Sequence, residues 1–180
     1  MTWYRGRQSG LALTALAVAA IGVTALACRQ ARVTAEAQPA PTGEGAPRGD
    51  AMALQAKCLS RMQYLATAVQ MYVQDYDERY PPADKWCDVT YLGYVTGWEL
   101  YRCPADAAAF SYAMNHKLSR VSESQITERM HTVCLYESST GRKNECDQHG
   151  SPGDSVPVPP RHQGGNNYAF VDGHGKWLRP

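Results

Sequence analysis

Hydrophobic residues recur at alternating three- and four-residue steps between residues 50 and 80. Six of them mark one continuous seam: Cys58, Met62, Leu65, Val69, Tyr72 and Tyr76. Polar side chains such as Gln70 fall on the opposite side. This spacing predicts one long amphipathic helix. Asp50 is suited to be its N-cap, and Pro81-Pro82 prevents it from continuing.

After residue 110 the pattern changes to the alternation that is typical of strands. The predicted strands cover residues 111–115, 131–137, 167–171 and 176–178. Asp172-Gly173 lies between the last two strands and predicts a β-hairpin, because glycine readily adopts the positive φ of such turns. The sequence therefore predicts an α+β fold in which one long helix packs on a small antiparallel sheet.

Two stretches show neither the helical spacing nor the strand alternation. Residues 84–101 are dense in aromatic side chains and are punctuated by Gly93 and Gly97, so we expect short helical turns or irregular loop. Their aromatic residues are expected to fill a small core, with sugar binding as the alternative. Residues 138–160 are polar and rich in glycine and proline, and are predicted to be a loop.

The first 28 residues have the pattern of an export signal. Two arginines precede an uncharged segment at residues 10–27, and Ala25-Leu26-Ala27 precedes Cys28. Three interpretations are open: a bacterial lipobox with lipidation of Cys28, ordinary signal-peptide cleavage, or an uncleaved membrane anchor. Each places the following domain outside the cytoplasm, in the periplasm or at the cell surface.

A segment rich in alanine, proline and glycine follows at residues 29–49 and is predicted to be a flexible tether. The folded domain is thus expected at residues 50–180. The chain has 18 Lys and Arg against 17 Asp and Glu, a formal charge of +1, and no basic run. This balance argues against nucleic-acid binding. We expect protein partners, and membrane attachment through the N-terminal segment.

Five cysteines lie within the predicted domain: Cys58, Cys87, Cys103, Cys134 and Cys146. None belongs to a Cys-x-x-Cys pair, which disfavours a zinc ribbon. An extracytoplasmic location permits disulfides, and the preferred pairs, Cys87–Cys103 and Cys134–Cys146, each close a short loop. Connectivity is not fixed by sequence. Cys58 lies on the apolar seam and is expected to be a small buried hydrophobe.

The end of the chain carries a family motif. His162 is followed by nine residues and then Asp172-Gly173, and this run resembles the prepilin-type processing-associated domain. Further blocks are similar to that family in the same order: Cys58 with Met71-Tyr72 and residues 75–81, then Cys103-Pro104, then residues 111–115. The resemblance covers roughly residues 54–178. It implies a pseudopilin-like fold and a relation to subunits of type II secretion systems and type IV pili.

The chain differs from prepilins because residues 10–27 lack their cleavage motif and are separated from the helix by the tether. We expect an exported, membrane-tethered, pseudopilin-like structural or interaction protein, without enzymatic activity or cofactor. The alternative is a secreted module that binds a glycan or metal at the aromatic loop and the end between His162 and His174.

His162, Asp172 and His174 are the residues of the motif with metal-ligating side chains. We expect no metal there. Instead, Asp172-Gly173 is predicted to be a turn, and the His162 ring is predicted to hydrogen-bond to a neighbouring carbonyl. The motif is therefore interpreted as structural.

Overall fold

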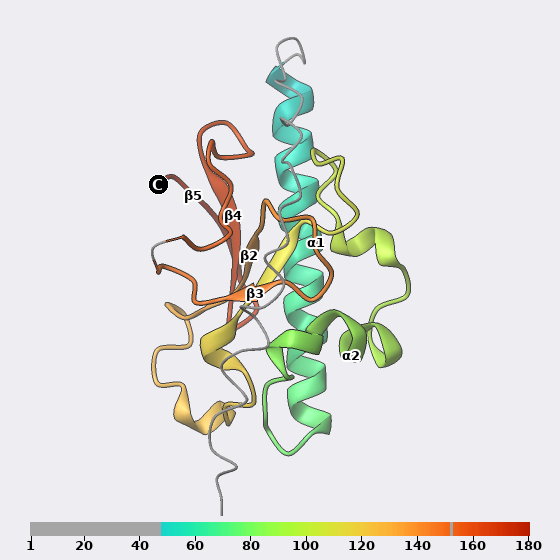
Figure 1. Ribbon diagram of the computed structural model, residues 1–180, viewed down its shortest axis with the longest axis vertical. Coiled ribbons are helices and arrows are strands. Elements are labelled where there is room, and N and C mark those ends of the chain that lie inside the picture. The colour runs from blue at the N-terminus through green and yellow to red at the C-terminus, as the bar shows by residue number, and fades with distance from the viewer. Residues whose placement is uncertain (1–47, 152) are drawn as a thin grey trace, which may run out of the picture. The chain divides into compact units, whose positions relative to one another are not determined.

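The computed structural model describes residues 48–151 and 153–180. The predicted export signal, Cys28 and almost all of the predicted tether lie outside these residues. Within them, one long helix comes first, followed by short helices and a five-stranded sheet (Figure 1). No helix in the described part of the chain combines the length and hydrophobicity needed to cross a membrane.

The predicted long helix is present as α1, Arg48–Asp75. Its seam is buried at Cys58, Met62, Leu65 and Val69, each 0% exposed, whereas Tyr72 is half-buried. Asp50 lies in the first turn and is not the N-cap. The helix also ends earlier than predicted, because Asp77 and Glu78 adopt φ of 52° and 55°, outside the helical region. Tyr76 therefore lies beyond the helix and is 54% exposed.

The sheet has the strand order β3-β1-β2-β4-β5. Its strands are β1 (Tyr112–Asn115), β2 (Val133–Glu137), β3 (Cys146–Asp147), β4 (Asn166–Phe170) and β5 (Gly175–Leu178). The pairs β1–β2, β2–β4 and β4–β5 are antiparallel, whereas β3 pairs parallel to β1. The α+β class is confirmed, but the sheet is mixed and not antiparallel as predicted. A two-residue strand within a polar loop gives no period to detect.

The predicted hairpin between β4 and β5 is confirmed. Gly173 has a φ of +91°, the conformation for which glycine was expected. Its N–H donates to the Phe170 carbonyl, and the Phe170 N–H donates to the His174 carbonyl, both at 2.9 Å. This turn sets the register in which Tyr168 faces Lys176.

α1 contacts β2, β4 and β5, and it also contacts α2 (Trp86–Gly93) and the 3-10 helix η2 (Trp98–Tyr101). Figure 1 shows the sheet and α2 on different sides of α1. In the aromatic stretch, Trp86 and Tyr101 are 0% and 1% exposed, so they fill the core as expected. The rings of Tyr91 and Trp98 stack on each other with centroids 3.8 Å apart.

Neither predicted disulfide forms: Cys87, Cys103 and Cys134 are buried free thiols. β1 lies between Cys134 on β2 and Cys146 on β3. Two strand spacings of about 4.8 Å exceed the Cα separation of about 4.4–6.8 Å that a disulfide spans. Cys103 instead directs its Sγ to within 3.3 Å of the His162 ring. A short loop in sequence was thus a poor guide to spatial contact.

Candidate metal centre

Four side chains with metal-ligating atoms converge inside the domain: Cys58, Cys103, Glu137 and His162. One ligand-type atom from each lies within 4.8 Å of those from the other three. All four residues are at most 3% exposed. Ionisable side chains are rarely buried to this degree without a partner, so the cluster needs a chemical explanation.

Two of these residues come from the helical half of the domain. Cys58 occupies a position of the buried seam of α1, so the same periodicity that builds the core brings its thiol inside. Cys103 follows η2 at the start of a turn, and its Sγ accepts a hydrogen bond from the Ala105 N–H at 3.4 Å.

The other two residues come from the sheet. Glu137 is the last residue of β2 and is 0% exposed. His162 precedes β4 in a tight loop, where its N–H and carbonyl both pair with Gly165, at 2.9 and 3.0 Å. A Cβ on Gly165 would lie 2.5 Å from the Leu178 carbonyl oxygen, so glycine permits the close approach that positions His162. Trp177 Nε1 also donates to the His162 carbonyl at 2.8 Å.

Glu137 is the hub of the cluster. Its Oε1 accepts a hydrogen bond from the Cys58 thiol at a Sγ–O distance of 3.0 Å, and the same oxygen lies 2.9 Å from His162 Nε2. Its Oε2 accepts the Asn167 backbone N–H at 2.9 Å. The Tyr112 hydroxyl lies 3.2 Å from Cys58 Sγ. Each carboxylate oxygen is therefore held by a donor inside the core.

Arg161 places a positive charge next to the cluster. Its Nη1 lies 3.4 Å from Glu137 Oε1, and its Nη2 pairs with Asp106 at 2.7 Å and donates to the Ser138 carbonyl at 2.8 Å. The guanidinium is thus shared by two carboxylates.

Burial and these partners set the protonation states. Burial raises the pKa of the Cys58 thiol far above its usual range, and Cys103 and Glu137 reinforce this. Burial opposes the charge on Glu137, but His162 and Arg161 outweigh it and lower its pKa. Burial also opposes charge on His162, but hydrogen bonds to Cys58 and Glu137 raise its pKa to about 9. Without a metal, the cluster holds a neutral Cys58 thiol, a carboxylate and an imidazolium.

The arrangement does not match a catalytic thiol site. In thiol–histidine–carboxylate catalysis the carboxylate orients one ring nitrogen while the other meets the nucleophile. Here Glu137 Oε1 and Cys103 Sγ both approach His162 Nε2, at 2.9 and 3.3 Å. Four ligand-type atoms within 4.8 Å of one another, with both thiols at 0% exposure, instead resemble the ligand set of a metal ion.

The structure does not bring together the three motif residues with metal-ligating side chains. His162 joins the buried cluster, whereas Asp172 and His174 lie in the β4–β5 turn, with β4 between them and His162. His174 Nδ1 is 2.6 Å from Asp172 Oδ1, and its ring stacks on Phe170 with centroids 4.3 Å apart. The predicted bond from the His162 ring to a carbonyl is wrong, because its partner is the Glu137 carboxylate.

Sequence reasoning missed Cys58, Cys103 and Glu137 as site residues. One signal was available: Cys58, Cys103 and His162 each belong to a different block of the family resemblance. Glu137 offered no signal, since it ends a strand like many surface residues.

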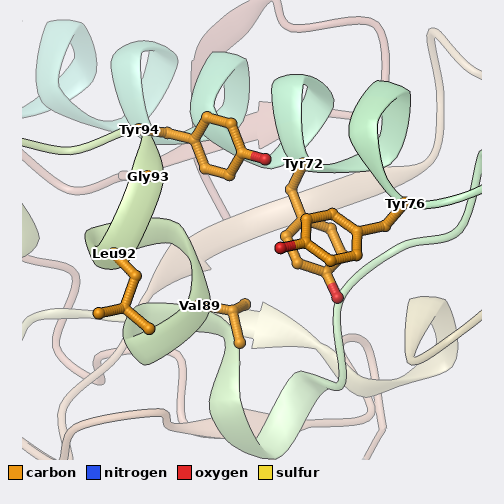
Figure 2. Close-up of a pocket in the computed structure, with 6 residues that line it drawn as sticks. All are labelled: Tyr72, Tyr76, Val89, Leu92, Gly93 and Tyr94. Atoms are coloured by element: carbon orange, nitrogen blue, oxygen red, sulfur yellow. The ribbon is translucent and has the colours of Figure 1, made fainter.

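A second feature is a small pocket between the end of α1 and α2 (Figure 2). It is lined by Tyr72, Tyr76, Val89, Leu92, Gly93 and Tyr94. The rings of Tyr72 and Tyr76 stack with centroids 4.2 Å apart, and the Tyr94 hydroxyl donates to Asp75 at 2.7 Å. Its volume of about 190 Å³ is below the range of about 300–1,000 Å³ typical of small-molecule sites.

No protein-family model matches the chain, and no curated protein or solved structure is significantly similar to it. The relation to the prepilin-type processing-associated domain therefore stays a prediction from the sequence blocks.

Proposed function

We propose that the chain is an exported, membrane-tethered, pseudopilin-like protein that serves as a structural or interaction subunit of a bacterial secretion or pilus-type system. The observation that carries this proposal is α1, a helix of 28 residues with one face buried against a small sheet. The resemblance implies the same combination of helical spine and sheet. The predicted export signal and tether immediately precede this helix.

Exposed apolar side chains of α1 supply surface for protein contacts. Met52, Tyr64 and Met71 are 62%, 44% and 46% exposed along the helix. The first turns of α1 also extend beyond the sheet (Figure 1). An interaction subunit with a helical spine would use such positions.

Fractionation of the full chain in its own host tests the tether. The wild-type protein is expected in the membrane fraction and to incorporate a fatty-acid label. Cys28→Ala is expected to lose the label and become soluble. A wild-type protein that is soluble and unlabelled would contradict lipid anchoring.

Site-specific photo-crosslinking tests the interaction role. A photoreactive residue at Met71 is expected to give a defined adduct with another subunit of the secretion or pilus-type system, identified by mass spectrometry. The same probe at exposed Lys176 on β5 serves as the control. Monomeric protein from both positions would contradict the proposal.

A metal-binding module is the second candidate, and the cluster of four ligand-type side chains favours it. A module that captures and releases metal needs an open site. The four residues here are at most 3% exposed, which favours a permanent metal over an exchanging one.

A further inference from the structure

We propose that the domain contains a structural Zn²⁺ site with four protein ligands: Cys58 Sγ, Cys103 Sγ, one Glu137 carboxylate oxygen and His162 Nε2. This site replaces the sequence-based expectation that the chain holds no metal. A zinc site of this kind is compatible with a pseudopilin-like subunit and does not depend on that function.

The cluster is close to the size of a zinc coordination sphere. Zn–S bonds of about 2.3 Å and Zn–N or Zn–O bonds of about 2.0–2.2 Å place tetrahedral ligands about 3.3–3.8 Å apart. Glu137 Oε1 lies 3.0 Å from Cys58 Sγ and 2.9 Å from His162 Nε2. Cys103 Sγ lies 3.3 Å from the same nitrogen. Small outward shifts of side chains would admit the ion.

The donor set selects the metal. Two thiolates and an imidazole suit a borderline-soft ion, whereas Ca²⁺ and Mg²⁺ require oxygen ligands. Four ligands that surround one point favour tetrahedral geometry, while Cu²⁺ prefers a tetragonal arrangement. Zn²⁺ fits both conditions.

A cation next to the ligands reduces the net charge of the occupied site. Zinc binds thiolates and a neutral imidazole, so both thiols release their protons to solvent. Two thiolates and one carboxylate then carry three negative charges against two on the ion. Arg161, 3.4 Å from Glu137 Oε1, offsets part of the remaining charge, because its guanidinium also pairs with Asp106.

Neighbouring donors hold the ligands in place. The Ala105 N–H donates to Cys103 Sγ at 3.4 Å, and the Asn167 N–H donates to Glu137 Oε2 at 2.9 Å. The Tyr112 hydroxyl, 3.2 Å from Cys58 Sγ, is placed to donate to a thiolate. Such outer contacts orient ligands and are typical of metal sites.

Four protein ligands leave no coordination position for substrate or water, so the site is structural and not catalytic. The ligands come from α1, the turn after η2, the end of β2 and the loop before β4. One ion would therefore link the helical half of the domain to the sheet, a common way to stabilise a small domain.

Metal analysis of the full chain, expressed with zinc in the medium and purified in detergent, tests the proposal. We expect one zinc per chain and an X-ray absorption spectrum with two sulfur ligands at about 2.3 Å and two nitrogen or oxygen ligands at about 2.0–2.2 Å. Folded protein without metal, a Cys58–Cys103 disulfide found by mass spectrometry, or one equivalent of iron or copper would each overturn it.

Matched variants identify the ligands. Cys103→Ser is expected to lose most of the zinc, whereas Cys134→Ser, at a buried free thiol outside the cluster, is expected to keep it. Equal loss in both would overturn the assignment.

Tyr112→Phe keeps all four ligands and tests the site even if Cys103→Ser fails to fold. We expect zinc affinity to fall about 10- to 100-fold. Unchanged affinity would count against Cys58 as a ligand.

Discussion

The two ends of β4 carry the two halves of one sequence motif, yet they differ in almost every physical respect. At one end, His162 is 3% exposed and meets Cys103, 59 residues away in sequence. At the other end, the His174 side chain is 39% exposed and pairs with Asp172, two residues away. One half is built from long-range contacts and the other from local ones.

This difference separates what a motif can specify by itself from what the rest of the chain decides. The Asp172-Gly173 turn follows from backbone preferences of its own residues. The role of His162 depends on a glutamate and two cysteines that the motif does not contain. The motif alone therefore does not determine the chemical role of its histidine; the fold does.

α1 supports both ends. Cys58 lies in the buried cluster, and three turns later Gln70 Nε2 donates to the Val171 carbonyl at 2.6 Å, beside the hairpin turn. Gln70 was predicted to face away from the core, and this is wrong. Because α1 contacts both ends of β4, substitutions at these contacts can compare the two ends directly.

The largest effect is expected at the buried end. Glu137→Leu removes the carboxylate that faces buried His162 and pairs with Arg161, whose other partner is Asp106. This removal should cost about 3–5 kcal/mol of unfolding free energy. Urea denaturation measures the loss. Glu128→Leu, at a side chain that is 75% exposed, should change stability by less than about 0.5 kcal/mol. Similar losses of stability in the two variants would show that the buried carboxylate matters no more than an exposed one.

The turn at the exposed end should be sensitive to backbone strain. Gly173→Ala places a Cβ at φ +91°, where it also lies 3.2 Å from Gln70 Oε1, and should cost about 1–2 kcal/mol. Gly93→Ala is the control, because it has no positive φ and a Cβ there meets nothing within 4 Å. Thermal denaturation separates the two. A neutral Gly173→Ala would mean that the turn conformation is not required.

Much of the fold was predictable because its signals are local. The seam of α1 and the β4–β5 hairpin each depend on residues close in sequence; the hairpin is confirmed, and the seam is confirmed from Cys58 to Val69. β3 was missed because two residues carry no period and pair with a strand far away in sequence. The disulfides were wrong because loop length says little about which cysteines meet in space.

The cluster was not predictable in the same way. Cys58 occupies a position of the apolar seam, so the sequence pattern cannot distinguish a metal ligand there from a small buried hydrophobe. Glu137 sits at the end of a predicted strand, but its partners Cys58 and His162 are distant in sequence, so its burial could not be read from its own neighbours. Only the three-dimensional arrangement shows that these side chains share one centre.

A weaker contact links α1 to the hairpin. Gln70→Ala removes the hydrogen bond to the Val171 carbonyl and should cost about 0.5–1.5 kcal/mol. Gln74→Ala, at an exposed position of α1, should be nearly neutral. Equal stability of both variants in urea would show that α1 does not secure the hairpin turn.

The smallest effect is expected for the exposed pair. Burial slightly opposes the charge on Asp172, but hydrogen bonds to His174 lower its pKa. A lowered pKa contributes stability above the unfolded value near 3.9, and that stability is lost as pH falls through the folded value. Asp172→Asn should therefore cost about 0.2–1 kcal/mol at pH 7 and progressively less as the pH falls below about 3.9. Melting temperatures across this range check the sign, and a constant difference would contradict it.

The sequence separation within the cluster also dictates when it can form. Cys58 and Glu137 are 79 residues apart, so their meeting requires closure of a long loop, whereas α1 and the β4–β5 hairpin need only local contacts. The cluster should accordingly assemble late in folding. Until then both thiols are exposed to oxidants, so the rate at which the sheet closes on α1 determines how many chains reach the native state with reduced cysteines.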